Sequence, residues 1–425
     1  MLLLSIDGLM PSQVLQAHTI GAKVPNLQRM VQDGAFATGV QTVVPSLTYP
    51  AHTTMLTGTS PATHGILGNI VFDPLETNKE GWYWYADAIR VPTLWSEARR
   101  AQYVTANICW PVSVGAPVDY NVVQFWRAAL PEDELLYSAL CSPHLVAELQ
   151  QAVGRMPYGE DFSPTADTMR AQFAEYVISH KHPNFTTAYL GSLDAAEHEA
   201  GPNSPSAIEA LNQVDVHVGR LRAAIEAEVP GRAVTAIVSD HGFVPYHVEI
   251  ELGVLLRKKR LMEFAADETV SSWRAAAWTA GGTAAIVLRD ADDEAARQVV
   301  ERLISELALD PKYGLERVYR KQEISALHGY SNADFVLALA PGFKFGRKLR
   351  GPVLVEHAGG THGYLPVVEE MDAAFFIVGP GIAPSQSLGR IDMRDIAPTL
   401  ASLLSLQLPR AEGRDVFAGR QAMPD

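Results

Sequence analysis

Cysteine is nearly absent from the chain, with only Cys109 and Cys141 among 425 residues. This scarcity excludes a disulfide-stabilised scaffold and a zinc site built from cysteines. No apolar run approaches the roughly 20 residues that a membrane span needs. The first residues also lack the basic segment and long apolar stretch of a secretory signal. We therefore expect a cytoplasmic protein that does not interact with a membrane.

Positive charge is scarce as well. Lys and Arg number 34 against 48 Asp and Glu, which gives a net charge of −14. Proteins that bind duplex nucleic acid gain affinity from basic residues that displace counterions, so this class is excluded as a first expectation. If the substrate is a phosphate ester, a local feature must attract it, such as metal ions or a helix N-terminus. The composition leaves the oligomeric state open.

Short apolar segments alternate with helical patterns along most of the chain. Strands are expected at 2–6, 35–43, 104–108, 188–193, 233–239 and 373–378, and helices at 25–33, 50–57, 206–228 and 395–404. This alternation is typical of an α/β fold with an open, mostly parallel central sheet that carries helices on both faces. A chain of this length exceeds one ordinary domain.

The pattern changes between residues 243 and 355. A strand at 283–288, a helix at 294–307 and a strand at 333–339 follow one another there, and a basic run occupies 257–260. We expect an inserted α+β subdomain at 243–355, between the two parts of a catalytic core at 1–242 and 356–425. The basic run is compatible with a solvated helix face.

Six residues of the types that bind metals come after the expected strands. They are Asp7, Asp194, His198, Asp240, His241 and His362. Ligands of open α/β sheets bind beyond the carboxyl ends of the strands, so residues distant in sequence can meet there. Three aspartates and three histidines suit two divalent ions, with zinc the first choice. Taken singly, an aspartate after a strand is also a common turn residue, and Asp194 with His198 also fits a helical surface pair.

A candidate nucleophile lies near the start of an expected helix. Thr48 stands two residues before Pro50, a residue suited to the first turn of a helix. The positive end of the helix dipole would attract an anion there, and a metal-activated hydroxyl is a good nucleophile. An ordinary helix cap is the alternative role for Thr48. Ser46, Thr53 and Thr54 are competing hydroxyls.

Five segments, taken in order, resemble the nucleotide pyrophosphatase/phosphodiesterase family of the alkaline phosphatase superfamily. They are Ser-Ile-Asp-Gly at 5–8, the segment from Thr48 through Ile66, Asp194-x-x-x-His198, Ser-Asp-His-Gly at 239–242 and Gly-Thr-His-Gly-Tyr at 360–364. Together they extend over nearly the whole chain. The resemblance implies an alkaline-phosphatase-like fold.

The resemblance also implies roles for individual residues. By analogy, Asp194, His198 and His362 would hold one zinc ion. Asp7, Asp240 and His241 would hold a second ion beside the oxygen of Thr48. Asn69 would donate to a phosphoryl oxygen. The remaining implied roles concern a nucleotide base, which would be sandwiched between Tyr49 and Tyr189.

The implied activity is hydrolysis of phosphodiester or phosphoanhydride bonds through a phosphothreonine intermediate, in a small phosphorylated substrate such as a nucleotide. Alternatives within the superfamily are a phosphomonoesterase and a phosphonoacetate hydrolase. The latter needs cationic residues for the substrate carboxylate, and the candidates are Lys79, Arg90 and Arg127. A metal-stabilised binding protein without turnover is the alternative from another class.

We predict that diesters are better substrates than monoesters. A monoester dianion carries one more negative charge than a diester, yet no Lys or Arg occurs at 32–77, the segment with Thr48 and Asn69. The measurement compares kcat/KM for an aryl phosphate and for its alkyl diester at one pH. A kcat/KM about tenfold higher for the monoester would contradict the assignment. Such a ratio corresponds to the same free-energy difference as a shift of one pKa unit.

Overall fold

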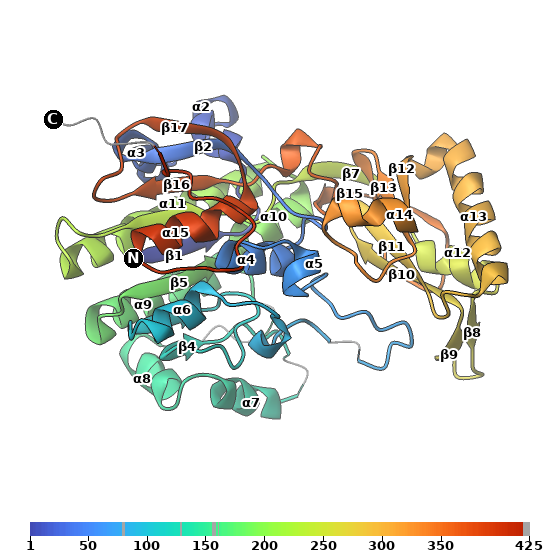
Figure 1. Ribbon diagram of the computed structural model, residues 1–425, viewed down its shortest axis with the longest axis horizontal. Helices are drawn as coiled ribbons and strands as arrows, with labels where there is room; N and C mark the ends of the chain where they lie inside the picture. Colours follow the sequence, from blue (N-terminus) through green and yellow to red (C-terminus); the bar gives the residue numbers. More distant parts are fainter. Residues whose placement is uncertain (79–80, 128–129, 155–158, 160, 420–425) are drawn as a thin grey trace.

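The computed structural model describes residues 1–78, 81–127, 130–154, 159 and 161–419. These residues form two lobes (Figure 1). The larger lobe is built on an eight-stranded sheet, and the smaller lobe contains sheets of four, three and two strands. The strands of the smaller lobe all come from the part of the chain between β6 (Thr235–Val238) and β16 (Phe375–Val378).

The large sheet has the strand order β17-β2-β16-β6-β1-β5-β3-β4. Its strands are β1 (Leu2–Ile6), β2 (Ala35–Gln41), β3 (Thr105–Ile108), β4 (Tyr120–Val122), β5 (Phe185–Leu190), β6 (Thr235–Val238), β16 (Phe375–Val378) and β17 (Gln386–Asp392). Only β16 runs antiparallel to its neighbours in this sheet. β1 lies between β5 and β6 and pairs in parallel with both. The expected mostly parallel sheet is thereby confirmed.

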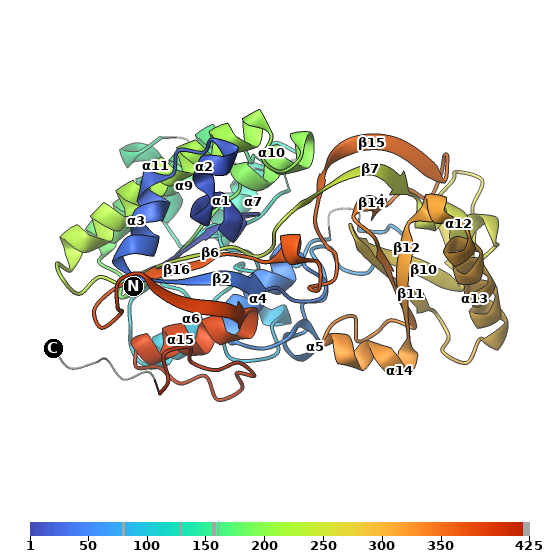
Figure 2. The same cartoon turned by 90° about the horizontal axis from the view of Figure 1, so that it is seen from above.

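Helices cover both faces of this sheet (Figure 2). One face carries α3 (Pro25–Asp33), α9 (Pro164–Lys181) and α11 (Pro205–Glu228), and the other carries α4 (Thr48–Thr57), α6 (Leu94–Arg100) and α15 (Ile396–Leu403). Alternate residues of β1 enter the two cores, because side chains of a strand point to opposite faces. Leu2 and Leu4 pack in the cluster that contains α11, while Leu3 packs in the cluster that contains α15.

The smaller lobe begins with β7 (Val244–Ile250) and ends with β15 (Leu354–Thr361), which pair antiparallel. β14 (Gly342–Phe345) pairs with the other side of β7. The remaining elements are α12 (Leu252–Lys258), β8 (Met262–Phe264), β9 (Val270–Trp273), β10 (Ala275–Ala280), β11 (Thr283–Leu288), α13 (Glu294–Leu309), β12 (Leu315–Arg320), α14 (Lys321–Ile324) and β13 (Phe335–Leu339). β11 and β13 pair antiparallel, so the strand, helix and strand expected at 283–288, 294–307 and 333–339 do not form a parallel βαβ unit.

Three element boundaries near the sheet edge differ from the sequence-based expectation. α4 begins at Thr48 rather than Pro50. Proline is tolerated at the third position of a helix, because the N–H groups of the first turn make no hydrogen bonds within the helix. β5 ends at Leu190, and α10 (Ser192–Ala200) follows at once, so Asp194 lies on a helix and not directly after a strand. β15 continues to Thr361, past the predicted subdomain boundary at 355.

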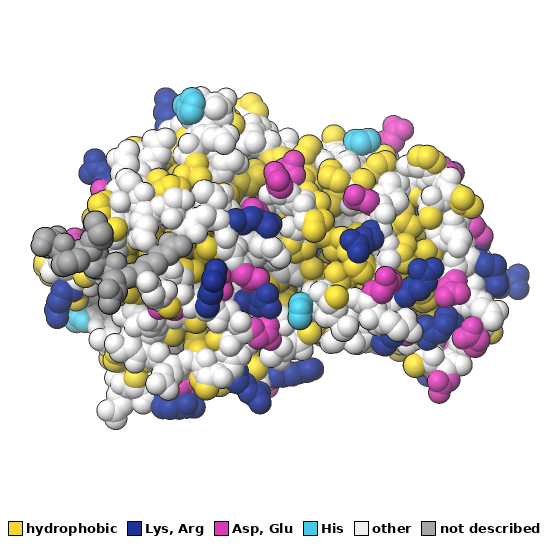
Figure 3. Space-filling model, turned by 45° about the horizontal axis from the view of Figure 1, so that its top comes forward, with side chains coloured by type: hydrophobic (Ala, Val, Ile, Leu, Met, Phe, Trp, Pro, Cys, Tyr) yellow, Lys and Arg dark blue, Asp and Glu magenta, His cyan; other side chains and the backbone are white. Residues whose placement is uncertain are grey.

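The surface carries both signs of charge. On the face shown in Figure 3, basic and acidic side chains are interspersed over both lobes. In the smaller lobe, Arg257 pairs with Glu268 and Lys259 pairs with Glu306 at the surface. Within the part of the chain that the structure describes, no helix combines the length and the hydropathy that a membrane crossing requires. Both cysteines are free and buried.

Candidate active site

A cavity of about 540 Å³ is lined by residues of both lobes. The larger lobe contributes Asp7, Thr48, Asn69, Asp194 and His198 to its wall. His362, which directly follows β15, completes this side. Asp240 and His241 follow β6 and are fully buried beside these residues. The structure thus brings together the residues that the sequence places after separate elements.

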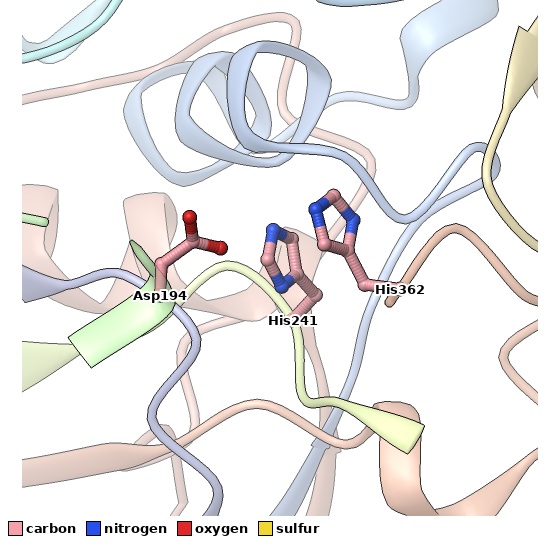
Figure 4. A group of neighbouring side chains, drawn as sticks. All are labelled: Asp194, His241 and His362. Carbon is pink, nitrogen blue, oxygen red and sulfur yellow. The ribbon is translucent and has the colours of Figure 1, made fainter. Parts of the chain in front are cut away.

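The metal-binding residue types form two overlapping groups. Ligand atoms of Asp7, Asp240 and His241 lie within 4.8 Å of one another, and so do those of Asp194, His241 and His362. The rings of His241 and His362 are stacked, with centroids 3.6 Å apart and an interplanar angle of 11° (Figure 4). Because His241 belongs to both groups, the two groups form one continuous cluster.

The histidines of the cluster are oriented by backbone carbonyls. Nδ1 of His362 donates to the carbonyl oxygen of Ser46 at 2.9 Å, and Nδ1 of His198 donates to that of Gly360 at 3.1 Å. A carbonyl only accepts, so in both rings Nε2 is left as the unprotonated atom that can bind a metal. Nε2 of His198 lies 3.5 Å from Oδ1 of Asp194.

The carboxylates are held by the loops that follow the strands. Tyr189 donates its hydroxyl hydrogen bond to Oδ2 of Asp7. Oδ1 of Asp240 accepts from the backbone N–H of Gly8 at 3.2 Å. Gly8 has a φ of +78°, a left-handed conformation that glycine adopts without strain. Each carboxylate thus uses one oxygen for the protein and keeps the other for the centre of the cluster.

Those remaining ligand atoms are buried without hydrogen-bond partners among the described residues. They are Oδ1 of Asp7, Oδ1 of Asp194, Oδ2 of Asp240 and both ring nitrogens of His241, of which Nε2 lies 3.1 Å from Oδ2 of Asp240. Buried polar atoms are rarely left unpaired, since each costs free energy comparable to a lost hydrogen bond. Two divalent cations would satisfy these atoms and would balance the three buried carboxylates. The donor set of carboxylate oxygens and imidazoles therefore fits zinc or a similar metal.

The pKa shifts of Asp7 and His362 agree with that interpretation. Burial, together with the carboxylates of Asp240 and Asp194, raises the pKa of Asp7 well above its usual range. Burial, together with the neighbouring His241 and His198, lowers the pKa of His362 well below its usual range. The protein alone thus disfavours the charged carboxylate of Asp7 and keeps His362 neutral. A bound cation would lower the pKa of Asp7 again, and it would need the neutral form of His362 as a ligand.

Thr48 is the first residue of α4 and lines the cavity. Its carbonyl oxygen accepts from Nδ1 of His52 at 2.7 Å, and Nε2 of His52 bonds to the hydroxyl of Ser5 at 2.8 Å. Burial lowers the pKa of His52 to about 4, so this histidine is a neutral anchor at physiological pH. The start of α4 is thereby tied to β1.

The competing hydroxyls are engaged in structural hydrogen bonds. Ser46 donates to the carbonyl oxygen of Tyr364, and Thr53 donates to that of Tyr49. The hydroxyl of Thr54 pairs with His64. None of these three residues is among the described residues that line the cavity. Thr48 is therefore the hydroxyl best placed for a reaction there.

Asn69 and a group of aromatic rings complete the wall near Thr48. Oδ1 of Asn69 accepts from the backbone N–H of Tyr49 at 2.9 Å, which leaves the amide N–H groups of Asn69 as donors. Trp82 packs against Tyr49 with ring centroids 5.4 Å apart. Trp126 and Phe162 line the same cavity. This wall joins one polar donor to several apolar faces.

Asp167 is a supporting residue that the sequence patterns do not reveal. It is buried on α9, and its carboxylate accepts from the backbone N–H groups of Gly191 at 3.0 Å and Ser192 at 2.8 Å, at the start of α10. Its other partner is the buried Arg170, at 2.8 Å. Asp167 therefore fixes the helix that carries Asp194 and His198.

The cationic residues at the cavity are not the expected ones. Arg127 lies 2.9 Å from Asp133, and the side chain of Arg90 packs against Gly65. Neither belongs to the described lining, and Lys79 falls outside the described residues. The lining cations come instead from the smaller lobe, and they are Lys344, Arg347 and Lys348. The local sequence at 344–348 contains no signal that places these residues beside Thr48, which precedes them by nearly 300 residues.

Comparison with known proteins identifies a family. The sequence model of type I phosphodiesterase / nucleotide pyrophosphatase matches residues 1–365. The chain is 24% identical over 389 residues to ectonucleotide pyrophosphatase/phosphodiesterase family member 7 of Homo sapiens, which covers 89% of this chain and 74% of the relative. It is 26% identical over 250 residues to family member 1 of Mus musculus, covering 57% of this chain. The chain spans only about a quarter of that longer relative's length.

Solved structures support the fold assignment. Human ectonucleotide pyrophosphatase / phosphodiesterase 5 superposes with a TM-score of 0.69 at 20% identity, over 97% of this chain and 96% of that one. The murine protein, solved as an inactive threonine-to-alanine variant in complex with AMP, gives a TM-score of 0.68 at 19% identity over the same shares. The alkaline-phosphatase-like fold expected from the sequence is confirmed by this similarity.

We predict that Asp167→Asn weakens zinc binding by about tenfold or more, the range found when residues that orient metal ligands are changed. The amide offers only one acceptor oxygen, so the start of α10 loses a hydrogen bond and the buried Arg170 loses its ionic partner. Zinc affinity is measured by competition with a chelating dye.

Asp293→Asn serves as the matched control for this variant. Asp293 also caps a helix, accepting from Ala296, and also pairs with an arginine, Arg274, but it lies in the smaller lobe away from the cavity. Its replacement should leave zinc affinity unchanged. Equal zinc affinity of Asp167→Asn and the wild type would show that Asp167 does not position the ligands.

Proposed function

Because the chain belongs to the type I phosphodiesterase / nucleotide pyrophosphatase family, we propose that it hydrolyses phosphodiester or phosphoanhydride bonds in a small phosphorylated substrate. The carrying observation is that Thr48 shares one cavity with buried metal-ligand atoms that have no protein partner. A nucleophile alone would be an ordinary helix residue, and a metal cluster alone would be structural. Their juxtaposition is what supports catalysis.

We assign the metal ligands in two sets. Asp194, His198 and His362 would hold one zinc ion. Asp7, Asp240 and His241 would hold the second ion. The hydroxyl of Thr48 would lie beside these two sets of ligands. When bound, the metals would supply positive charge for the reacting oxygens and lower the pKa of the attacking hydroxyl.

The residues of the chain supply the rest of the reaction. The oxygen of Thr48 attacks phosphorus, a bond forms between them, and the bond from phosphorus to the leaving oxygen breaks. The leaving group departs with a proton from solvent, and a phosphothreonine remains. Water then attacks the same phosphorus, which releases a phosphate monoester and restores the hydroxyl of Thr48.

Charge on the phosphoryl oxygens is met by donors around Thr48. The amide N–H groups of Asn69 would donate to a phosphoryl oxygen, because the amide oxygen already accepts from the backbone N–H of Tyr49. At the start of α4 the N–H of Tyr49 is bonded to Asn69, and Pro50 has no N–H. Ala51 donates to Leu47, which leaves the N–H of Thr48 and the helix dipole to attract an anion. His52 keeps the first residue of α4 in place for the attack.

The aromatic wall indicates a substrate with an apolar or planar substituent. Tyr49 and Trp82 offer faces on which a base can stack, with roughly 1–3 kcal/mol per base as the usual contribution. A solved structural neighbour binds AMP, and a nucleotidyl group is the substituent we propose here. The expected partner of Tyr49, Tyr189, lines the same cavity but donates its hydroxyl hydrogen bond to Asp7, so we assign it to positioning that ligand.

Removal of metal should abolish activity. We predict that exhaustive chelation stops hydrolysis of bis(4-nitrophenyl) phosphate and that zinc restores it, because the buried carboxylates of the cluster need a cation to act. Metal analysis of the restored protein should find a pair of ions per chain. Full activity in a metal-free preparation would exclude this mechanism, whereas zinc binding without turnover would favour the silent binding protein.

Loss of the nucleophile should separate chemistry from metal binding. Thr48→Ala should lower kcat by roughly 10³-fold or more while the zinc content stays unchanged, since Thr48 is outside both ligand sets. Asp240→Ala should lose zinc as well as activity. The matched control is Thr53→Ala, which removes a neighbouring hydroxyl of the same helix that bonds to Tyr49. If Thr48→Ala kept wild-type turnover, another nucleophile would be at work.

A further inference from the structure

A glutamine without a hydrogen-bond partner for its side chain lies in the wall of the cavity. Gln124 stands two residues after the end of β4, and its side chain is fully buried. Neither Oε1 nor Nε2 of its amide has a hydrogen-bond partner among the described residues, yet Gln124 belongs to the lining of the cavity. An unpaired polar group in the interior costs folding free energy, so a sequence rarely keeps one without a function for it.

The neighbouring buried amides show the usual arrangement. Nδ2 of Asn121, on β4, donates to the carbonyl oxygen of Ser113 at 2.8 Å, and Oδ1 of Asn121 accepts from Nδ2 of Asn107 at 2.8 Å. Oδ1 of Asn107, on β3, accepts in turn from the backbone N–H of Trp110 at 3.0 Å. Both asparagines are thus paired as buried amides usually are, whereas the amide of Gln124 is not.

The position of Gln124 is fixed by its surroundings. Its backbone N–H donates to the hydroxyl of Ser113 at 3.1 Å, and the carbonyl oxygen of Ser113 accepts from Asn121. The next side chain, Phe125, packs against Trp84 with ring centroids 4.4 Å apart. The unpaired amide therefore extends from a backbone segment that hydrogen bonds and aromatic packing hold in place.

Gln124 lies at the edge of the sheet where the candidate metal ligands meet. β4 runs parallel to β3, β3 to β5 and β5 to β1, so Gln124 follows β4 at the same edge at which Asp7 follows β1. The cavity lining also contains aromatic rings, which are those of Tyr49, Trp82, Trp126 and Phe162. Aromatic faces stack on a planar group but distinguish poorly between one planar group and another.

An amide can supply the selectivity that stacking lacks, because it offers a hydrogen-bond donor beside an acceptor. We propose that Gln124 is a specificity-determining residue whose amide binds the polar edge of a planar substituent on the scissile phosphorus. That edge carries a donor next to an acceptor, as the edges of adenine and uracil do. The proposal rests on the proposed function, since it needs the scissile group to lie at Thr48, and it names the feature of the substituent that the site selects.

The test compares 4-nitrophenyl nucleoside 5′-phosphates in pairs that differ only at this edge. One pair is the adenosine ester and the purine riboside ester, which lacks the amino group. The other pair is the uridine ester and the 3-methyluridine ester, which lacks the ring N–H. In the zinc-loaded wild type we expect kcat/KM to be about tenfold higher for the base that keeps the donor, in at least one pair, which is the effect of one hydrogen bond in a buried site.

A variant without the amide locates this preference. Gln124→Met removes both polar atoms and nearly keeps the volume of the side chain, so the ratio of the two kcat/KM values should fall to about one. Gln213→Met is the matched control, since Gln213 is a glutamine of the larger lobe that donates to Glu209 and lies outside the described lining of the cavity. It should preserve the ratio. Each ratio is taken within one preparation, so a loss of folded protein affects both substrates alike.

The stability of Gln124→Met separates a ligand-binding role from a structural one. Replacing an unpaired buried amide by an apolar side chain should leave the urea midpoint of the zinc-loaded protein equal to or higher than that of the wild type. A glutamine that held the fold by its hydrogen bonds would lower this midpoint when it is replaced. Urea unfolding of both proteins is followed by tryptophan fluorescence.

A ratio near one in both substrate pairs would overturn the proposal. A preference that survives Gln124→Met, or a lower urea midpoint of that variant, would overturn it as well. Failure of the proposed function has a different result, because the zinc-loaded wild type would then hydrolyse none of the four esters.

Discussion

Uncompensated negative charge in a buried cluster is the constraint on which the rest of this structure depends. Asp7 and Asp240 are fully removed from water, and Asp194 lies beside them at the cavity floor. Taking an ion out of water costs several kcal/mol even after relaxation, and no Lys or Arg of the described chain pairs with these carboxylates. His241 is the histidine nearest to them, with Nε2 3.1 Å from Oδ2 of Asp240, and the carboxylates of Asp240 and Asp194 raise its pKa against the effect of burial. The carboxylates and imidazoles form groups that could hold a metal ion, and a bound cation would make this arrangement favourable.

That constraint explains the surroundings of the cluster. Phe243 contacts the rings of His198, His241 and His362 edge-on and supports their orientation. Tyr189 supports Asp7 with a hydrogen bond, as Asp167 supports the start of α10. Such neighbours are costly to remove, because a displaced ligand leaves buried charge unpaired. Both the apolar core and the hydrogen bonds to the residues of the cluster therefore hold the larger lobe in place.

The sequence predicts those parts of the site that follow from sheet geometry. Asp7 and Asp240 come directly after buried apolar strands, and parallel strands bring such positions to one edge. The position of Asp194 was less predictable, because the apolar run at 188–193 contains both the end of β5 and the first turn of α10. Periodicity cannot separate a short buried strand from a buried helical turn. The start of α4 was displaced by two residues for a similar local reason, since Pro50 fits several positions of a first turn.

Residues whose partners are distant in sequence could not be predicted from local patterns. Asp167 lies in the first turn of α9, where an acidic residue is common, and its role depends on the docking of α9 against the start of α10. The position of Lys344 depends on the return of β14 to β7, which places this residue in the wall of the cavity that both lobes line. The metal-binding residue types come mainly from the edge of the large sheet, whereas Lys344, Arg347 and Lys348 come from the smaller lobe. Two parts of the chain thus form one cavity, so the sequence of the smaller lobe can change while the residues at the sheet edge stay in place.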